Sequence, residues 1–289
     1  MAVAATASPA ATPSGLWRQA LRNGSVRFGG AIVLAMVFLA VFAPFLGTVD
    51  PVRIDPAVRL AGFSRDHLFG TDLFGRDVYS RAVYGARSSL IVGFATAMAS
   101  IACGLVIGLL AGWFRGFDAV AMRVMDGLMA IPTFLLAIAL VALTRGSIAT
   151  VVFALTVPEV PRVVRLVRGQ VMTVRTEPYV EAAISVGTSV PHLLVRHILP
   201  STVAPLLVLG TYICASAILI ESGLSFLGTG LPPEIPSWGN MVSEGRAFFQ
   251  VFPSLVFVPS AFLALTVLGV NILGDGLRDT LDPRLGKRT

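Results

Sequence analysis

The chain has 289 residues, of which 55% are hydrophobic and 13% are charged. Soluble domains carry about 25% charged residues, so this composition, with a mean hydropathy of +0.81, excludes a soluble globular domain and predicts an integral membrane protein. The net charge of +6 does not indicate nucleic-acid binding, because the basic residues form no patch interleaved with exposed aromatic residues on a soluble module.

Apolar stretches long enough to span a bilayer recur along the chain. A spanning helix needs about 20 such residues. The stretches are apolar all round rather than alternating, which favours helices over the strands of a membrane barrel. We therefore expect an all-α integral membrane protein with six transmembrane helices. The predicted spans are residues 28–49, 88–114, 127–144, 146–167, 198–220 and 247–274.

The distribution of arginine predicts the orientation of these spans. With both termini in the cytoplasm, most of the 22 basic residues lie on the inner side, as the positive-inside rule requires. This topology makes residues 50–87 an extracytoplasmic loop, 168–200 a cytoplasmic loop and 275–289 a cytoplasmic tail. Residues 1–27, rich in Ala, Thr, Ser and Pro, are predicted to form a disordered cytoplasmic tail, and 28–289 to form the membrane domain. The first span is expected to be an uncleaved anchor, since it exceeds the roughly 7–15 apolar residues of a signal peptide.

The outer loop contains two aspartates in turn-forming sequences. Asp77 is expected to cap a helix that starts at Val78, and Asp72 to stabilise the preceding turn. Both could alternatively hold a divalent cation, or serve a membrane-embedded enzyme together with His67. No further ligand or nucleophile crowds the segment, so we predict neither a metal site nor a catalytic residue. Further along the chain, Trp238 is expected in the aromatic belt at the membrane surface.

Three acidic residues fall at membrane depth, where a charge costs about 2.5–3.5 kcal/mol and normally faces a cavity or a partner. Glu159 is predicted to pair with Arg162, and Asp126 has Arg123 one turn earlier. Glu221 has no arginine within a turn, so it could line a translocation path or make a structural bond to a partner subunit. An ion-gradient secondary transporter with these acids as proton carriers is an alternative.

Residues 176–200 carry the signals of two short helices joined by a bend. Thr176 can cap a helix with Pro178 in its first turn, and Gly187 is expected near its end. Ser189 starts a second short helix that leads into the next span. We call residues 176–200 the elbow.

The first helix of the elbow is amphipathic. Val180, Ile184 and Gly187 share one face, while Ala182 and Ala183 leave room for close approach by another surface. A helix lying on lipid would instead offer bulky anchors and a polar face rich in Lys and Arg. The elbow is therefore predicted to dock on a protein.

Two sets of residues resemble a known family. Glu181-Ala182-Ala183, Gly187 and Leu199-Pro200, in this spacing, resemble the EAA loop of ABC importer permeases, although His197 stands where that family usually has Ile. The segments "HLFGTDLFGRDVYSRAVYGARSSLIVG", "MRVMDGLMAIPTFLLAIAL", "RLVRGQV", "LSFLGTGLPPEIPSWGNMVSEGR" and "NILGDGLRDTLDPRL" are similar to blocks of the second, C-type permease subunit of dipeptide, oligopeptide and nickel importers.

This resemblance implies a type I ABC importer permease in the inner membrane. The residues it assigns to ATPase coupling are Glu181, Ala182, Ala183, Gly187, Leu199 and Pro200. It implies a sister permease subunit as heterodimer partner, two ATP-binding subunits and an extracytoplasmic solute-binding protein. The chain lacks the GxxxxGK[ST] motif, so ATP is expected to bind the partner subunits and not this chain. Di- or oligopeptides are the expected substrates, with nickel or another small solute as the alternative.

Overall fold

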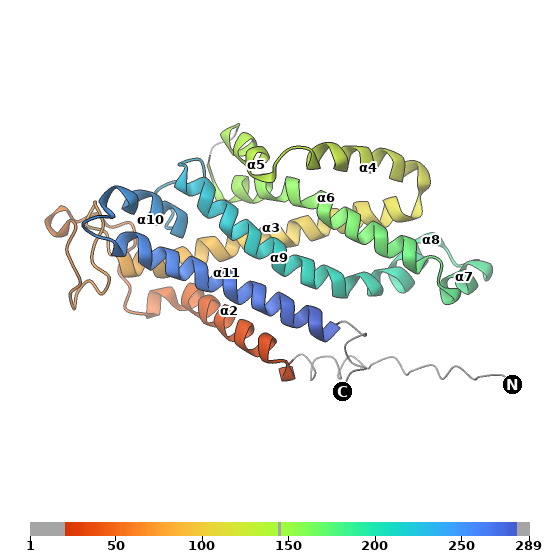
Figure 1. Ribbon diagram of the computed structural model, residues 1–289, viewed down its shortest axis with the longest axis horizontal. Helices are drawn as coiled ribbons and strands as arrows, with labels where there is room; N and C mark the ends of the chain where they lie inside the picture. Colours follow the sequence, from red (N-terminus) through yellow and green to blue (C-terminus); the bar gives the residue numbers. More distant parts are fainter. Residues whose placement is uncertain (1–20, 144–145, 282–289) are drawn as a thin grey trace.

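A computed structural model describes residues 21–143 and 146–281, and the helices and turns of this part of the chain contain no extended strand (Figure 1). The predicted all-α class is thus confirmed. The α-helices are α2 (Gly24–Phe42), α3 (Val78–Trp113), α4 (Arg115–Met129), α5 (Thr133–Ala142), α6 (Ile148–Val174), α7 (Pro178–Ser185), α8 (Val190–His192), α9 (Leu199–Phe226), α10 (Trp238–Gly245) and α11 (Ser254–Leu281). Short 3-10 turns form η1 (Ala43–Phe45), η2 (Pro56–Val58) and η4 (Arg246–Phe248), and η3 (Leu193–Ile198) is a π-helix.

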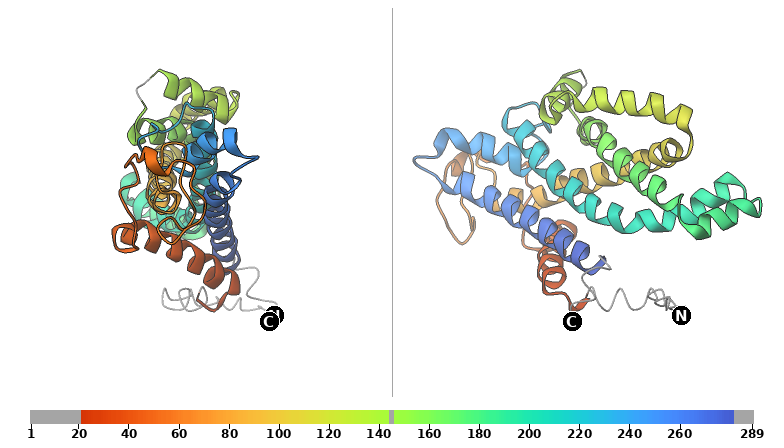
Figure 2. Two further views of the ribbon diagram at one scale, coloured as in Figure 1. Left: turned by 90° about the vertical axis from the view of Figure 1, so that its left-hand side faces the viewer. Right: turned by 45° about the vertical axis from the view of Figure 1, so that its right-hand side comes forward.

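The long helices lie side by side and run between two ends of the molecule (Figures 1 and 2). One end carries the loop between α2 and α3 together with α10. The opposite end carries α7 and α8, and α2 begins and α11 ends on that side (Figure 1). The predicted outer loop and the elbow therefore lie at opposite ends of the bundle.

Within the described residues, four helices are long and apolar enough to cross a membrane: Gly24–Phe45, Val78–Trp113, Val190–Phe226 and Ser254–Leu281. A fifth candidate is the pair α4 and α5, whose axes are bent by 88°. The prediction of one continuous helix over 127–144 is therefore wrong. Pro132 lacks an N–H and disfavours helical backbone in the residue before it, which explains the break.

The N-terminal boundary differs from the prediction. Residues 1–20 of the predicted disordered tail 1–27 lie outside the described residues. Gly24 already begins α2, and the Asn23 side chain caps this helix by accepting a hydrogen bond from the Ser25 amide (2.9 Å). The membrane helix thus starts before residue 28.

Two other helices extend into segments that were predicted to be a loop or a tail. Val78 begins α3, with Asp77 as its cap (Ser80 N to Oδ2, 2.8 Å), as predicted. Residues 78–87 of the predicted loop are consequently helical. At the other terminus α11 continues to Leu281, so only residues 282–289 of the predicted tail remain, and they lie outside the described residues.

The most extensive contact between long helices joins α3 to α6. Three glycines, one per turn of α3, face three valines on α6. A Cβ added at Gly108 would lie 2.7 Å from the Cβ of Val167, closer than real side chains approach. Small residues spaced four apart allow such close packing of membrane helices. The facing pairs are Gly104 with Val163, Gly108 with Val167, and Gly112 with Val171.

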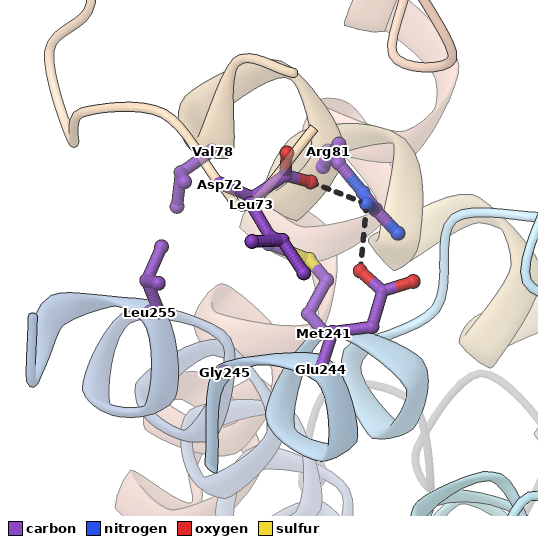
Figure 3. A pocket seen from close by; sticks show the side chains of 8 residues that line it. All are labelled: Asp72, Leu73, Val78, Arg81, Met241, Glu244, Gly245 and Leu255. Carbon is purple, nitrogen blue, oxygen red and sulfur yellow. Dashed lines mark hydrogen bonds and ion pairs between the residues drawn. The ribbon is translucent and has the colours of Figure 1, made fainter. Parts of the chain in front are cut away.

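At the outer end, a buried ion-pair cluster joins the loop, α3 and α10 (Figure 3). Arg81, 1% exposed, donates through Nη1 to Asp72 (2.7 Å) and to Glu244 (2.9 Å). Arg76 binds the same two carboxylates, with Nε 2.6 Å from Asp72 Oδ2. Asp72 therefore fixes the turn through two guanidinium groups, in agreement with its predicted structural role. The sequence did not suggest Glu244 as a partner, because it is distant in the chain.

Trp238 was expected in a surface belt, and this prediction is wrong. Its side chain is fully buried, and the indole Nε1 donates to the Ala82 carbonyl (3.0 Å). The reason is that α10 folds back against α3, where Gly85 leaves room for the indole ring: a Cβ there would lie 3.0 Å from Trp238 Cδ1.

The close α3–α6 packing predicts that a single added methyl group on α3 lowers the stability of the protein. Gly108→Ala should lower the stability of the protein by about 1–3 kcal/mol, because Val167 must move. Gly169→Ala on α6 is the matched control, since nothing lies within 4 Å of its Cβ position. Thermal unfolding of the detergent-purified variants would measure the difference; equal melting temperatures would contradict the close packing.

The ion-pair cluster predicts that loss of one of its carboxylates is destabilising, whereas loss of an exposed carboxylate nearby is not. Glu244→Gln should destabilise the outer end by about 3–5 kcal/mol, because two buried arginines lose a carboxylate. Glu234→Gln, at an exposed position of the preceding loop, should be neutral. Proteolysis of the outer loop in purified protein would report the change, and equal cleavage rates in both variants would show that the cluster does not stabilise this end.

Candidate functional site

The elbow is built as two short helices around a turn. Glu177 is the N-cap of α7 and Pro178 occupies its first turn, so the helix starts one residue later than a Thr176 cap would place it. The chain turns at Gly187 and continues into α8. The predicted order of helix, bend and helix is confirmed.

Gly187 ends α7 with a left-handed residue, at φ +82°. Its amide donates to the Ile184 carbonyl (2.9 Å), and the Thr188 amide donates to the Ala183 carbonyl (3.1 Å). This pair of bonds is the Schellman pattern, which favours glycine. No atom lies within 4 Å of a Cβ built at Gly187, so the backbone conformation, rather than lack of space, requires glycine here.

One buried side chain and one ring contact hold α7 against η3. Val180 is fully buried in the main apolar core, which also contains Leu194 and Ile198 of η3. The Tyr179 ring stacks on His197, with 6.4 Å between ring centroids. Of the face predicted from sequence, only Val180 is buried, because Ile184 remains 44% exposed.

The six residues assigned to coupling fall into two groups. Glu181, Ala182 and Gly187 are exposed and Ala183 is half-buried, all on α7 or its end. Leu199 and Pro200 instead form the start of α9. The structure therefore places one group on a free surface and the other at the junction with a long helix.

That junction is continuous. Val190–Phe226 forms one helical span of 37 residues. Within it, the Leu199 amide donates to the Leu194 carbonyl, five residues back, as in a π-turn. Pro200 has no N–H to continue the usual pattern, and π-turns often mark functional positions. The elbow is thus joined to α9 without a break in the helix.

Comparison with known proteins is consistent with this geometry. Residues 104–287 match the family model "Binding-protein-dependent transport system inner membrane component". Residues 14–62 match "N-terminal TM domain of oligopeptide transport permease C". The chain belongs to this family of permeases. It is an integral protein of the inner membrane and a transport component, not an enzyme, and its family works with ATPase and binding-protein partners.

Individual relatives cover nearly the whole permease. A probable peptide ABC transporter permease of Sinorhizobium fredii is 52% identical, over 98% of this chain and 97% of the relative. A dipeptide transport permease of Alkalihalophilus pseudofirmus is 40% identical, over 93% and 90%. The oligopeptide transport permease of Bacillus subtilis is 36% identical, over 94% and 91%.

Two of the three acidic residues expected at membrane depth form ion pairs. Glu159, only 3% exposed, accepts from Arg162 (2.8 Å), as predicted. Asp126 pairs with Arg165 (2.6 Å) and not with Arg123, because α6 packs beside α4 and brings a closer guanidinium.

Glu221 is fully buried near the end of α9. Its Oε1 accepts from the Ser225 hydroxyl (2.7 Å), whose oxygen in turn accepts from the Leu231 amide (3.1 Å). The carboxylate thus ties α9 to the loop before α10. In this conformation no solute can contact it, so a place in the translocation path would require α10 to move.

Gly187 allows a test of the elbow geometry by itself. Gly187→Val should weaken the end of α7, since a β-branched residue in this conformation costs about 1–2 kcal/mol or more. Gly187→Asn should be tolerated, because Asn adopts left-handed backbone readily. Hydrogen exchange of the amides at 184–188 would be faster in the Val variant alone; identical exchange in both variants would contradict the turn.

Proposed function

We propose that the permease is one transmembrane subunit of a peptide ABC importer, and that its elbow docks on an ATP-binding subunit. A sister permease forms the other half of the translocation path. Two ATP-binding subunits hydrolyse ATP at the cytoplasmic face, and an extracytoplasmic binding protein delivers the solute. Peptides are the proposed solute because the relatives that match over nearly the whole chain bear names of peptide, dipeptide and oligopeptide permeases.

The main support for a coupling role is the structure of the elbow. Its α7 is anchored by one buried valine but leaves Glu181 and Ala182 exposed. Small residues permit close contact with a protein groove, and α7 carries no Lys or Arg, whereas a lipid-surface helix would carry many cations. The helix that follows runs unbroken from Val190 to Phe226. An exposed docking surface fixed to a long helix is what transmission of ATP-driven motion requires.

We further propose six membrane passes with both termini in the cytoplasm. In chain order, α2 is the first pass, α3 the second, the bent pair of α4 and α5 the third, and the charged helix α6 the fourth. The helix Val190–Phe226 is the fifth pass and α11 the sixth. Arginines gather at or near the helix ends on the side of the elbow, which supports a cytoplasmic position. They are Arg22, Arg27, Arg115, Arg168, Arg175, Arg196 and Arg278.

A pairing with a sister permease is supported by a polar pair at membrane depth. The Arg162 guanidinium lies 4.9 Å from the centre of the Tyr212 ring, and Tyr212 is 50% exposed. Both residues lie near the middle of their helices, α6 and α9. A charge is costly in hydrocarbon, so this surface is better suited to a second subunit or a water-filled path than to lipid.

A charge reversal on the elbow tests the proposal. In the assembled complex, Glu181→Arg should reduce binding-protein-stimulated ATP hydrolysis and peptide uptake by at least about tenfold, because an interface charge reversal costs more than about 1.4 kcal/mol. Asp279→Arg, the same reversal at an exposed position on the final turns of α11, is the control and should retain both activities.

Co-purification of all subunits separates the possible causes. Loss of uptake with an intact complex supports a coupling role, and loss of the ATP-binding subunits supports docking at α7. Wild-type uptake and hydrolysis in Glu181→Arg would refute the role of the elbow. Uptake driven by an ion gradient in the absence of ATP would refute the importer itself.

A further inference from the structure

A polar cavity of about 570 Å³ lies where the ends of α3 and α6 meet the start of α4. Three arginines line it: Arg115 of α4, Arg168 of α6 and Arg175, which directly follows α6. They are accompanied by a single acidic residue, Asp118. The cavity is at the same end of the bundle as the elbow, and two of its lining residues, Arg175 and Thr176, connect α6 to α7.

The charges of this cavity do not balance. Asp118 is occupied by Arg168, which donates through both Nε and Nη2 (Nη2 to Oδ2, 2.7 Å). Arg115 and Arg175 have no acidic partner among the residues that the structure describes. Two guanidinium groups therefore remain without a counter-ion, and they come from different helices that converge on one space.

Both of these arginines are placed to bind an anion. The Arg175 guanidinium lies 5.1 Å from the centre of the Trp113 ring, and its Nη1 donates to the Trp113 carbonyl (3.4 Å), so its orientation is restricted. Arg115 is the first residue of α4, whose N-cap residue, Phe114, makes no side-chain capping bond. The free amides and the dipole of a helix N-terminus favour a negative charge.

The surroundings indicate that the anion belongs to an amphipathic molecule. Trp113 ends α3, at the level where tryptophan marks the membrane interface. Met172 lines the cavity and is 51% exposed, and Ala111 and Gly112 at the end of α3 add further apolar wall. A soluble anion has no use for such apolar neighbours, whereas a lipid presents a phosphate and an acyl chain together.

We propose that this cavity binds the phosphate group of an anionic glycerophospholipid in the cytoplasmic leaflet. Arg115 and Arg175 contact the phosphate, and the acyl chains lie along Met172. Basic pockets between membrane helices on the cytoplasmic side suit such headgroups. Because Arg175 immediately precedes the elbow, a bound lipid restrains the base of α7. The leaflet rests on the topology proposed above, whereas the binding chemistry does not depend on transport.

The test uses the assembled complex in detergent, titrated with dioleoylphosphatidylglycerol and followed by hydrogen exchange of residues 172–178. The lipid should protect this segment in the wild type. In the double variant Arg115→Gln and Arg175→Gln, the affinity should fall on the order of 30-fold, the combined effect of two arginines near an anionic surface. Arg123→Gln removes one exposed arginine two turns further along α4; it is the control for a general loss of positive charge and should bind as the wild type does.

Two further titrations identify the source of the anion. Dioleoylphosphatidylcholine should protect the segment weakly, since its headgroup is zwitterionic. Inorganic phosphate alone should not protect it; equal protection by phosphate would replace the lipid with a free-anion site and overturn the proposal.

Mass spectrometry of the native complex supplies an independent measurement. The wild type and the Arg123→Gln control should retain one more phosphatidylglycerol per copy of this chain than the double variant. If the double variant retains the same number of lipids but loses its ATP-binding subunits, the arginines bind an acidic surface of those subunits, and the lipid proposal is wrong. Neither readout requires solute uptake, so the result is distinguishable from a failure of the importer assignment.

Discussion

The close contact between α3 and α6 determines where the functional parts of the permease lie. α6 is the most highly charged of the long helices, with Glu159 and three arginines on its second half, and it would insert poorly into lipid by itself. The glycines of α3 bring the two backbones together at Gly104, Gly108 and Gly112. Valine has few side-chain conformations in a helix, so its fit against these glycines is rigid. The end of α6, and with it the elbow, is thereby fixed relative to α3.

One continuous helix runs from the elbow to the outer end of the molecule. The helix Val190–Phe226, with 37 residues, is about 55 Å long at 1.5 Å per residue. Its inner end carries the π-turn beside α7, and its outer end is attached to the loop before α10 through Glu221 and Ser225. Beyond that loop, Trp238 and the Arg81 cluster hold α10 against α3. The buried polar contacts at the outer end would therefore oppose any movement of this helix that begins at the elbow.

The sequence predicted those features that depend on local chemistry. The turn at Gly187 and the cap at Asp77 follow from the preferences of single residues, and the apolar stretches follow from composition. The spacing of Gly104, Gly108 and Gly112 in α3 is likewise a local pattern that indicates close helix packing. The partner of Glu244, the burial of Trp238 and the pairing of Asp126 with Arg165 depend on which helices become neighbours. Residues so distant in the chain give no periodic signal of their contact, so these features required the structure.

The acidic residues separate the importer from an ion-coupled transporter. A proton carrier must release its proton to water on alternate sides of the membrane, which requires a carboxylate that is accessible and not permanently paired. Glu159 is buried and paired with Arg162, and Glu221 is buried and accepts from the Ser225 hydroxyl, whereas Asp126 pairs with Arg165 at an exposed position. The two buried carboxylates are thus engaged within the fold and have no access to water in this conformation. In the proposed importer the energy for transport reaches the helices from outside the membrane, and we propose that the exposed α7, attached to an unbroken helix, receives it.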